Sequence, residues 1–287
     1  MIRRSEPPAH TGVPRPVLRI PALAAAIAAL SILAAAPAPA AAQAWQDPAR
    51  VRLIDGGVLA DGPDRLAGLE ILLDPGWKTY WRDPGDSGIP PQLDFSGSRN
   101  LAAVEIEWPA PELHWDGYAW IVGYTEAVVF PLVVTPQDPD VPVDLDVRLA
   151  YGVCKDICVP AEAEAERLLD GRSARPAGIE FYRARVPVAV DGPDGRGGVV
   201  SATVDRSGEV PVLELRLKLP GEPDDAYAVV EAPEGWYLPV PERSDAEPGL
   251  FLVPLDGAPD AAAIRGAELR VTGVSPTFSF EQRVALD

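Results

Sequence analysis

The sequence predicts an all-β protein of many short strands, and three observations indicate this class. The 33 prolines and 25 glycines interrupt short apolar runs along the whole chain. Almost no stretch keeps the 3.6-residue period of an amphipathic helix. Several runs instead alternate apolar and polar residues, which is typical of half-buried antiparallel strands. With 287 residues, of which 47% are hydrophobic, the chain can form two ordinary domains or one large β domain.

The amino-terminal segment has the regions of an export signal in the required order. Four arginines between residues 3 and 19 precede an apolar run over residues 20–33, and small residues with an A-x-A pattern follow up to Ala44. The alternative, an uncleaved membrane anchor, needs about 20 clean apolar residues, and this run is shorter and ends in prolines. We therefore expect residues 1–42 to be a cleaved signal peptide and the remaining chain to be exported and soluble, without membrane insertion.

The charge of the chain limits its partners. It carries 43 acidic and 25 basic side chains, with a net charge of −18. Binding to nucleic acid requires basic surfaces that neutralise phosphates, so this function class is excluded. The acidic surplus is typical of a surface that keeps a protein soluble.

The clearest strand covers residues 143–151, where Val143, Leu145, Val147, Leu149 and Tyr151 alternate with polar or small residues. Prolines at the ends of apolar runs, such as those at positions 109, 131, 142 and 220, are expected at strand starts and sheet edges. Further strands are expected over residues 66–73, 102–108, 127–134, 199–204, 212–219 and 268–274.

Two shifts in composition suggest a domain boundary. Residues 170–178 have the composition of a linker, and residues 191–198 have the composition of a loop. We expect a first domain over residues 43–177, which holds both cysteines, and a second domain over residues 178–287. A short helix is expected near residues 180–185.

The two cysteines of the chain, Cys154 and Cys158, are separated by three residues. Alternating runs flank the pair, which predicts a hairpin with Lys155, Asp156 and Ile157 as its loop. Opposed positions in such a hairpin have Cβ atoms about 4.5–5.5 Å apart, close enough for a disulfide after slight closure. A competing interpretation is a helix over residues 161–169, which are rich in Ala and Glu.

A disulfide between residues so close in sequence excludes few unfolded conformations, because its entropic benefit grows with loop length. The pair is therefore better explained by thiol–disulfide exchange, in which one thiolate attacks and a second thiol resolves the mixed disulfide. Lys155 favours a thiolate and Asp156 opposes it, so the sequence leaves open which cysteine attacks. A structural staple stays the alternative.

Metal binding has little support in the sequence. After loss of the signal peptide, His114 is the one remaining histidine, and Met1 is the one methionine of the chain. Two cysteines and one histidine lack a fourth soft ligand for zinc and a thioether for copper(I). No motif for a phosphate loop, a serine nucleophile or a zinc protease is present. We expect neither a metal site nor a cofactor.

Two long segments resemble the periplasmic amino-terminal domain of the disulfide reductase DsbD and its relative ScsB. They are YGVCKDICVPAE at residues 151–162 and PGWKTYWRDPGDSGIPP at residues 75–91. The resemblance covers residues 50–170 and is weaker over residues 180–287. It implies an immunoglobulin-like β-sandwich with the cysteine pair at one end, followed by a second, smaller β-sandwich. The cysteine spacing is similar to the ScsB type and is narrower than in typical DsbD domains.

The resemblance also implies a cap of aromatic and acidic residues over the disulfide, at Tyr80, Trp81, Trp115, Asp116 and Tyr118. Such an apolar lid keeps unwanted thiols from an exchangeable bond. The alternative for each aromatic is ordinary sandwich core.

The function implied by the resemblance is that of a periplasmic protein-disulfide reductase component, in systems such as cytochrome c biogenesis or copper tolerance. It passes electrons from a membrane-embedded DsbD or ScsB-type reductase to periplasmic thioredoxin-like proteins or client disulfides through Cys154 and Cys158. Because this chain has no expected transmembrane segment after residue 42, we expect the electron donor to be a separate protein. The alternative function is a non-catalytic binding or assembly module of two sandwiches, with a structural disulfide.

Overall fold

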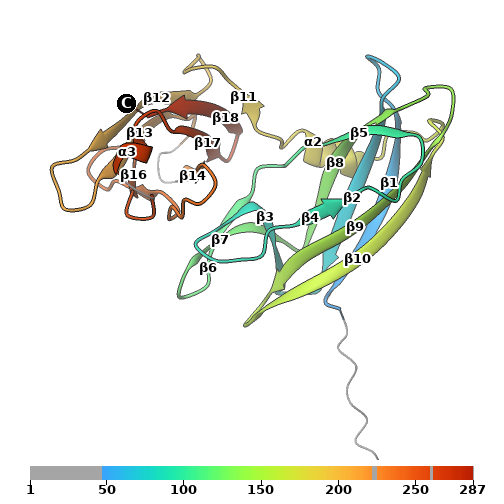
Figure 1. Cartoon of the computed structure of the whole chain (residues 1–287), viewed down its shortest axis with the longest axis horizontal. Coiled ribbons are helices and arrows are strands. Elements are labelled where there is room, and N and C mark those ends of the chain that lie inside the picture. Colours follow the sequence, from blue (N-terminus) through green and yellow to red (C-terminus); the bar gives the residue numbers. More distant parts are fainter. Residues whose placement is uncertain (1–46, 222–224, 259–260, 287) are drawn as a thin grey trace, which may run out of the picture. The chain divides into compact units, whose positions relative to one another are not determined.

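The described part of the chain is almost entirely β-structure (Figure 1). A computed structural model describes residues 47–221, 225–258 and 261–286. The expected signal peptide, residues 1–42, lies outside the described residues. Within the described ranges, no helix has both the length and the apolar character needed to cross a membrane.

The first of two sheets before residue 170 contains four antiparallel strands. Its order is β1-β2-β8-β5, so that β2 and β8 are central. Almost every residue of β2 is buried, because this strand is covered on both faces. The bounds are β1 (Ala49–Val58), β2 (Arg65–Leu73), β5 (Leu101–Ile106) and β8 (Ala127–Pro136).

The second sheet carries the cysteines. Its order is β10-β9-β3-β7-β6, and the short strand β4 also pairs with β9. All of these pairings are antiparallel. The bounds are β3 (Lys78–Gly85), β4 (Gln92–Asp94), β6 (Glu112–Trp115), β7 (Trp120–Thr125), β9 (Val143–Cys154) and β10 (Cys158–Leu169).

The hydrophobic core lies between these two sheets. Alternate residues of β9, from Val143 to Val153, point into it, as the alternation in the sequence predicts. Trp81 of β3 and Phe130 of β8 are fully buried in the same cluster. The arrangement is a β-sandwich, in which each inner face contributes every second residue.

A short helix, α2 (Ala177–Arg183), follows the sandwich and confirms the helix expected in this region. Its Ile179 is fully buried against Leu66 and Val129. The hydroxyl of Tyr182 donates a hydrogen bond of 2.6 Å to the carbonyl oxygen of Ala127. The helix therefore packs on the first sheet of the sandwich, although the domain boundary expected from composition assigns most of it to the second domain. That boundary stays a prediction.

The remaining strands form a second, smaller β domain with two four-stranded sheets. Their orders are β11-β18-β17-β14 and β12-β13-β16-β15. A separate cluster that includes Leu213, Phe251 and Phe280 fills the space between them. A short helix, α3 (Ala261–Ile264), precedes β17. The strand bounds are β11 (Val188–Ala189), β12 (Gly198–Asp205), β13 (Val212–Lys218), β14 (Tyr227–Glu231), β15 (Glu242–Arg243), β16 (Leu250–Pro254), β17 (Glu268–Ser275) and β18 (Phe278–Ala285).

This architecture confirms the all-β prediction of an immunoglobulin-like sandwich followed by a second β domain. One expectation about proline was wrong. Pro131 lies inside the central strand β8, opposite Gly68 of β2. Its carbonyl oxygen accepts a hydrogen bond from the Glu107 amide, on the side of β5 and just past the end of that strand at Ile106. Since the nitrogen of a strand residue faces the same side as its carbonyl, Pro131 lacks only the reciprocal bond to Glu107, past the end of β5, and the pairing of β8 with β2 loses no bond.

Candidate functional site

The two cysteines face each other across the turn of the β9–β10 hairpin. Cys154 ends β9, Cys158 begins β10, and the two are paired in register and joined by a disulfide. The turn closes with a hydrogen bond of 3.2 Å from the Lys155 amide to the Ile157 carbonyl oxygen. The hairpin with a three-residue loop is therefore confirmed, and the alternative helix over residues 161–169 is wrong because this segment is β10.

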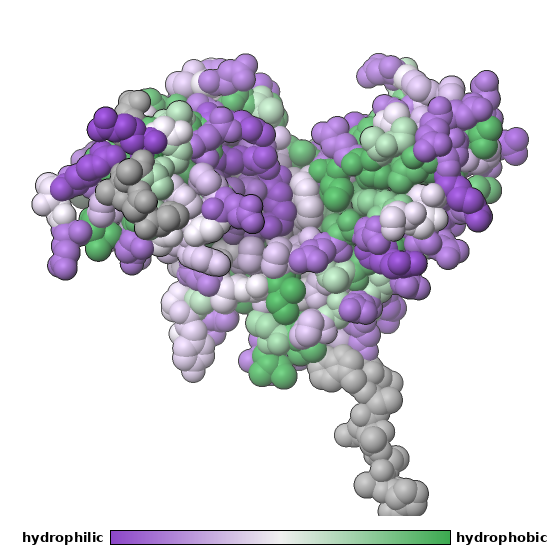
Figure 2. Space-filling view, in the orientation of Figure 1, coloured by the Kyte–Doolittle hydropathy of each residue, from purple (hydrophilic) through white to green (hydrophobic). Residues whose placement is uncertain are grey.

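The two cysteines differ in exposure. Cys154 is 3% exposed and clusters with Tyr80 and Ile121, whereas Cys158 is an exposed residue. The neighbouring Ile157 is 67% exposed. Figure 2 shows hydrophobic surface at the end of the sandwich that carries this turn. A visiting protein can therefore reach Cys158 more readily than Cys154.

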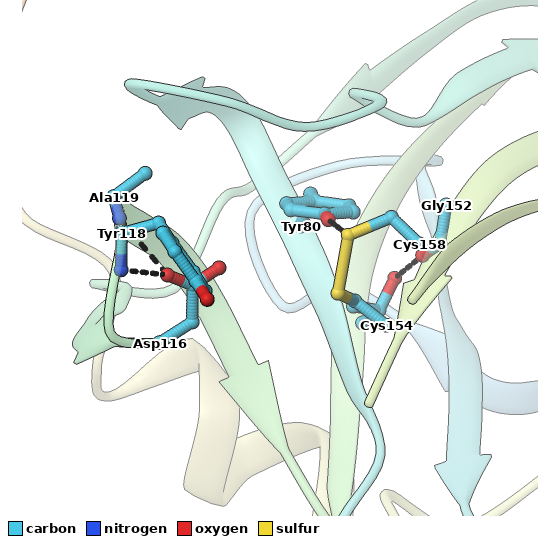
Figure 3. Close-up of a disulfide and its surroundings, with 8 residues drawn as sticks. Tyr80, Asp116, Tyr118, Ala119, Gly152, Cys154 and Cys158 are labelled. Atoms are coloured by element: carbon cyan, nitrogen blue, oxygen red, sulfur yellow. Dashed lines mark hydrogen bonds between the residues drawn. A yellow bond between two sulfur atoms is a disulfide. The ribbon is translucent and has the colours of Figure 1, made fainter. Parts of the chain in front are cut away.

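The hydroxyl of Tyr80 donates a hydrogen bond of 2.8 Å to the Sγ atom of Cys158 (Figure 3). Tyr80 lies on β3 and is fully buried. Burial raises the pKa of its phenol above the ordinary value, and the negative charge of Asp116 raises it further. Tyr80 is therefore protonated at neutral pH and able to donate a hydrogen bond to sulfur.

Two glycines leave the space that the Tyr80 ring occupies. A Cβ atom at Gly152 would lie 2.6 Å from the Tyr80 Cε2 atom, and one at Gly88 would lie 2.4 Å from its Cε1 atom. Gly88 also has a φ of +154°, which side chains rarely adopt. On the residue of β3 that precedes Tyr80, the Thr79 hydroxyl donates a hydrogen bond of 2.9 Å to the Gly152 carbonyl oxygen. The sheet thus fixes the position of the phenol relative to the disulfide.

The structure places the other expected cap residues differently from Tyr80. Asp116 accepts hydrogen bonds of 2.9 Å from the backbone amides of Tyr118 and Ala119, in the turn between β6 and β7. These bonds, together with the charge of Lys78, lower the pKa of its carboxyl group. Tyr118 is 93% exposed and Trp115 is 55% exposed. In Figure 3, Asp116 and Tyr118 stand apart from the disulfide, so they do not cover it.

Trp81 is not brought to the disulfide. It is fully buried in the sandwich core, on the opposite face of β3 from Tyr80, because successive residues of a strand point to opposite faces. This position agrees with the alternative interpretation, in which Trp81 is an ordinary aromatic residue of the sandwich core. Lys155 and Asp156 lie exposed in the turn, and the Lys155 Nζ atom is 3.5 Å from the Pro75 carbonyl oxygen.

Sequence reasoning missed several residues at this site. Lys78 pairs with Cys154 across β3 and β9, Ile121 packs in the same small cluster, and Gly152 and Gly88 adjoin the Tyr80 ring. Lys78 and Gly88 are in the segment that carries the resemblance, and Gly152 is two residues before Cys154. The signal that could have found Lys78 is its spacing from Tyr80, since residues i and i+2 share a strand face.

Within residues 47–221, 225–258 and 261–286, no group of three or more His, Cys, Asp or Glu side chains is placed to hold a metal ion. The site that the residues do build has three parts. One cysteine, Cys158, is an exposed residue, a neutral proton donor contacts its sulfur, and the second cysteine is buried beside it. This arrangement suits the exchange of a disulfide with an incoming thiolate.

Comparisons with known proteins support the same interpretation. No curated protein matches this chain. Seven chains of known structure match, and one is described as the N-terminal periplasmic domain of ScsB from Proteus mirabilis. That structure shares 23% sequence identity and a TM-score of 0.60, over 83% of this chain and 91% of the other, so it shows a common fold. The family model described as "Thiol:disulfide interchange protein DsbD, N-terminal" matches residues 55–170. Residues 55–170 thus resemble a DsbD N-terminal domain, and this matched segment contains both cysteines and Tyr80.

Proposed function

We propose that this protein is a periplasmic thiol–disulfide exchange protein that works through Cys154 and Cys158. It accepts electrons from a membrane-embedded reductase of the DsbD or ScsB type. It then passes them to thioredoxin-like proteins or to client disulfides. The family model that matches residues 55–170 supports thiol–disulfide exchange, and the export signal expected over residues 1–42 supports a periplasmic location.

The observation that carries this proposal is the hydrogen bond from Tyr80 to the Cys158 sulfur, together with the exposure of Cys158 and the burial of Cys154. A structural disulfide needs no proton donor at one sulfur. In the reduced protein, the same hydrogen bond stabilises a thiolate at Cys158, because hydrogen bonds to a charged form favour that form. Cys158 is therefore the cysteine that exchanges with partners, and Cys154 is the resolving cysteine.

The exchange proceeds in two balanced steps. A thiolate of the electron donor bonds to the Cys158 Sγ atom, the bond between Cys154 and Cys158 breaks, and its electron pair goes to the Cys154 Sγ atom. A second thiolate of the donor then attacks the donor's own sulfur in the mixed disulfide and releases the Cys158 thiolate. The donor becomes a disulfide, and this chain gains two electrons and, after protonation, two protons. Delivery to a client disulfide runs the same steps in reverse.

The direct test is a redox titration of the full chain, followed by labelling of free thiols with a maleimide that shifts mobility on a gel. We expect reversible labelling of both cysteines and a reduction potential above about −300 mV, the range of exchangeable disulfides. A lower potential, or cysteines that no dithiol reduces in the native protein, would contradict the proposal. The Cys154→Ser variant is expected to trap a mixed disulfide with a dithiol partner through Cys158, and Cys158→Ser is expected to trap much less.

A second candidate function is a non-catalytic binding module in which the disulfide pins the hairpin. The observation in its favour is that the large side chains of Trp115, Tyr118 and Ile157 are exposed. A variant with both cysteines replaced by serine separates the two candidates. Loss of exchange with an unchanged thermal midpoint supports the exchange protein. A lower thermal midpoint, together with a wild-type disulfide that dithiols do not reduce in the native protein, supports the module.

A further inference from the structure

We propose that Lys78 stabilises the thiolate that forms at Cys154 when the disulfide opens, and so determines which sulfur receives the electron pair. This inference rests on the proposed exchange function and concerns the same site. It assigns to Lys78 an electrostatic role that complements the hydrogen bond of Tyr80 at Cys158. The argument starts from the distribution of lysine in the chain.

Lysine is rare in this protein. Of 25 basic residues, 22 are arginines and three are lysines, at positions 78, 155 and 218. Two of these three lysines adjoin Cys154. Lys155 follows it in the chain, and Lys78 is its partner across the sheet. The ion pairs within 4.0 Å among the described residues use arginine or histidine as the cation, and neither Lys78 nor Lys155 takes part in them.

The register of the sheet places Lys78 directly opposite Cys154. Cys158, Cys154, Lys78 and Thr125 form one row across β10, β9, β3 and β7. Directly opposed residues of antiparallel strands point to the same face, with Cβ atoms about 4.5–5.5 Å apart. The ammonium group of a lysine in this position can lie near the Cys154 sulfur, and a positive charge within about 4–6 Å lowers the pKa of a thiol.

The two partners of the disulfide therefore have different environments. Tyr80, two residues after Lys78 on the same strand face, donates its neutral hydroxyl to Cys158. Lys78 is paired with Cys154, the buried cysteine. When an incoming thiolate bonds to Cys158, the electron pair of the broken bond goes to Cys154, where a buried thiolate needs a positive charge. Lys78 meets that need because it is part of the sheet rather than of the exposed turn.

The other charged groups around Cys154 include a carboxylate that opposes the effect of Lys78. Lys155 and Asp156 lie in the exposed turn, and Asp116 lies in the turn between β6 and β7. The charge of Lys78 contributes to the lowered pKa of the Asp116 carboxyl, so the two groups interact. Asp116 is thus ionised at neutral pH and offsets part of the effect of Lys78. Removal of Asp116 should therefore act on Cys154 in the opposite direction to removal of Lys78.

The test measures the thiolate at Cys154 without a partner protein. In the Cys158→Ser variant, Cys154 is the one thiol of the exported chain, and its ionisation is followed by the absorbance of the thiolate near 240 nm as the pH is raised. We expect Lys78→Gln in this background to raise the midpoint by about 1 pH unit, which is about a tenfold smaller thiolate fraction at neutral pH. Lys78→Arg should restore most of the midpoint, and Asp116→Asn should lower it.

The matched control is Lys218→Gln, which removes the third lysine from β13 of the second domain. We expect it to leave the midpoint of Cys154 unchanged. If Lys78→Gln leaves the midpoint unchanged, or shifts it no more than Lys218→Gln does, the inference is overturned. Circular dichroism of each variant checks that the fold is retained, and Lys78→Met, which also removes the charge, gives the answer if Lys78→Gln unfolds.

The outcome is separable from that of the proposed function. If the wild-type disulfide resists reduction by dithiols while Lys78→Gln still shifts the midpoint of Cys154, then exchange fails and the electrostatic role of Lys78 stands. If exchange is reversible but the midpoint does not respond to Lys78, then the function stands and Lys78 is not its determinant.

Discussion

The two faces of strand β3 differ in function, although both are buried at their centres. Trp81 and Tyr80 are neighbours in the chain, and each is fully buried. Trp81 lies in the large core between the sheets. Tyr80 lies in a small cluster with Ile121 and Cys154 on the other face, where it contacts the disulfide. One face of the strand therefore supports the fold, and the other positions the sulfur atoms.

This difference shows how a β-sandwich can place reactive groups on a rigid support. The period of two along a strand separates the two tasks, so the residues that touch the disulfide are fixed by a core that they do not themselves form. The core side chains of β9 alternate with Gly152 and Cys154 on the opposite face. We can test this separation with substitutions on each face, beginning with the largest expected effect.

The Trp81→Ala variant tests the core face. Removal of a fully buried tryptophan side chain leaves a cavity, and we expect the free energy of unfolding to fall by about 3–5 kcal/mol. Urea denaturation followed by circular dichroism gives this value. The matched control is Trp115→Ala, which truncates a tryptophan that is 55% exposed and should change stability by less than about 0.5 kcal/mol. Similar losses for the two variants would show that Trp81 is not a core residue.

The Gly152→Ala variant tests the opposite face at a comparable depth. Its Cβ would lie 2.6 Å from the Tyr80 ring, so the ring must move, and we expect a loss of about 1–3 kcal/mol in stability. Unlike Trp81→Ala, it should also change the reduction potential, since the displaced hydroxyl no longer meets the Cys158 sulfur. Gly195→Ala is the control, because a Cβ there meets no atom within 4 Å. If the reduction potential of Gly152→Ala equals that of the wild type, the position of the Tyr80 ring does not influence the redox chemistry of the disulfide.

The sequence predicted the hairpin well because its information is local. The alternation over residues 143–151 and the flanks of the cysteine pair fix two strands and a three-residue loop, and the structure has this register. The expected strands over residues 66–73, 127–134, 199–204 and 268–274 are each present. In each of these, the apolar residues that indicate the strand lie within a single short segment.

The sequence could not decide between Tyr80 and Trp81 for a nonlocal reason. Both aromatics are adjacent in one short apolar segment, and which of them faces the disulfide depends on the register between β3 and β9. In the structure Lys78 pairs with Cys154 and Thr79 pairs with Val153. A slip of one residue would exchange the two faces and bring Trp81 to the sulfur. That register is set by long-range pairing, which a single sequence does not reveal.

The Tyr80→Phe variant tests the hydroxyl alone. It keeps the ring in its space and removes the hydrogen bond to Cys158, so we expect stability of the oxidised protein to fall by about 0.5–1.5 kcal/mol. In the reduced protein, the Cys158 thiolate is no longer stabilised by a hydrogen bond from the Tyr80 hydroxyl. Cys158 should therefore react about tenfold more slowly with a disulfide reagent at pH 7. Stopped-flow kinetics measures this rate. Tyr118→Phe, at a residue that is 93% exposed, is the control. Equal rates for Tyr80→Phe and the wild type would remove Tyr80 from the mechanism.

The smallest expected effect concerns the pH dependence of stability. Burial raises the pKa of Tyr80 in the folded state above that of the unfolded chain. Its contribution to stability is therefore complete below pH of about 10, and it is lost as the pH rises from there through the higher folded pKa. Tyr124 is also buried, with its pKa raised by burial, and it adds a loss in the same direction.

We expect Tyr80→Phe to destabilise the protein at pH 7 and to reduce the further loss of stability between pH 9 and 11, because phenylalanine does not ionise. Tyr124→Phe, on the core face, should reduce the same alkaline loss without changing the reactivity of Cys158. Urea denaturation at several pH values measures both slopes. If the alkaline loss in Tyr80→Phe equals that of the wild type, the Tyr80 phenol is not protected from ionisation by its burial, and the two faces of β3 differ less than the structure indicates.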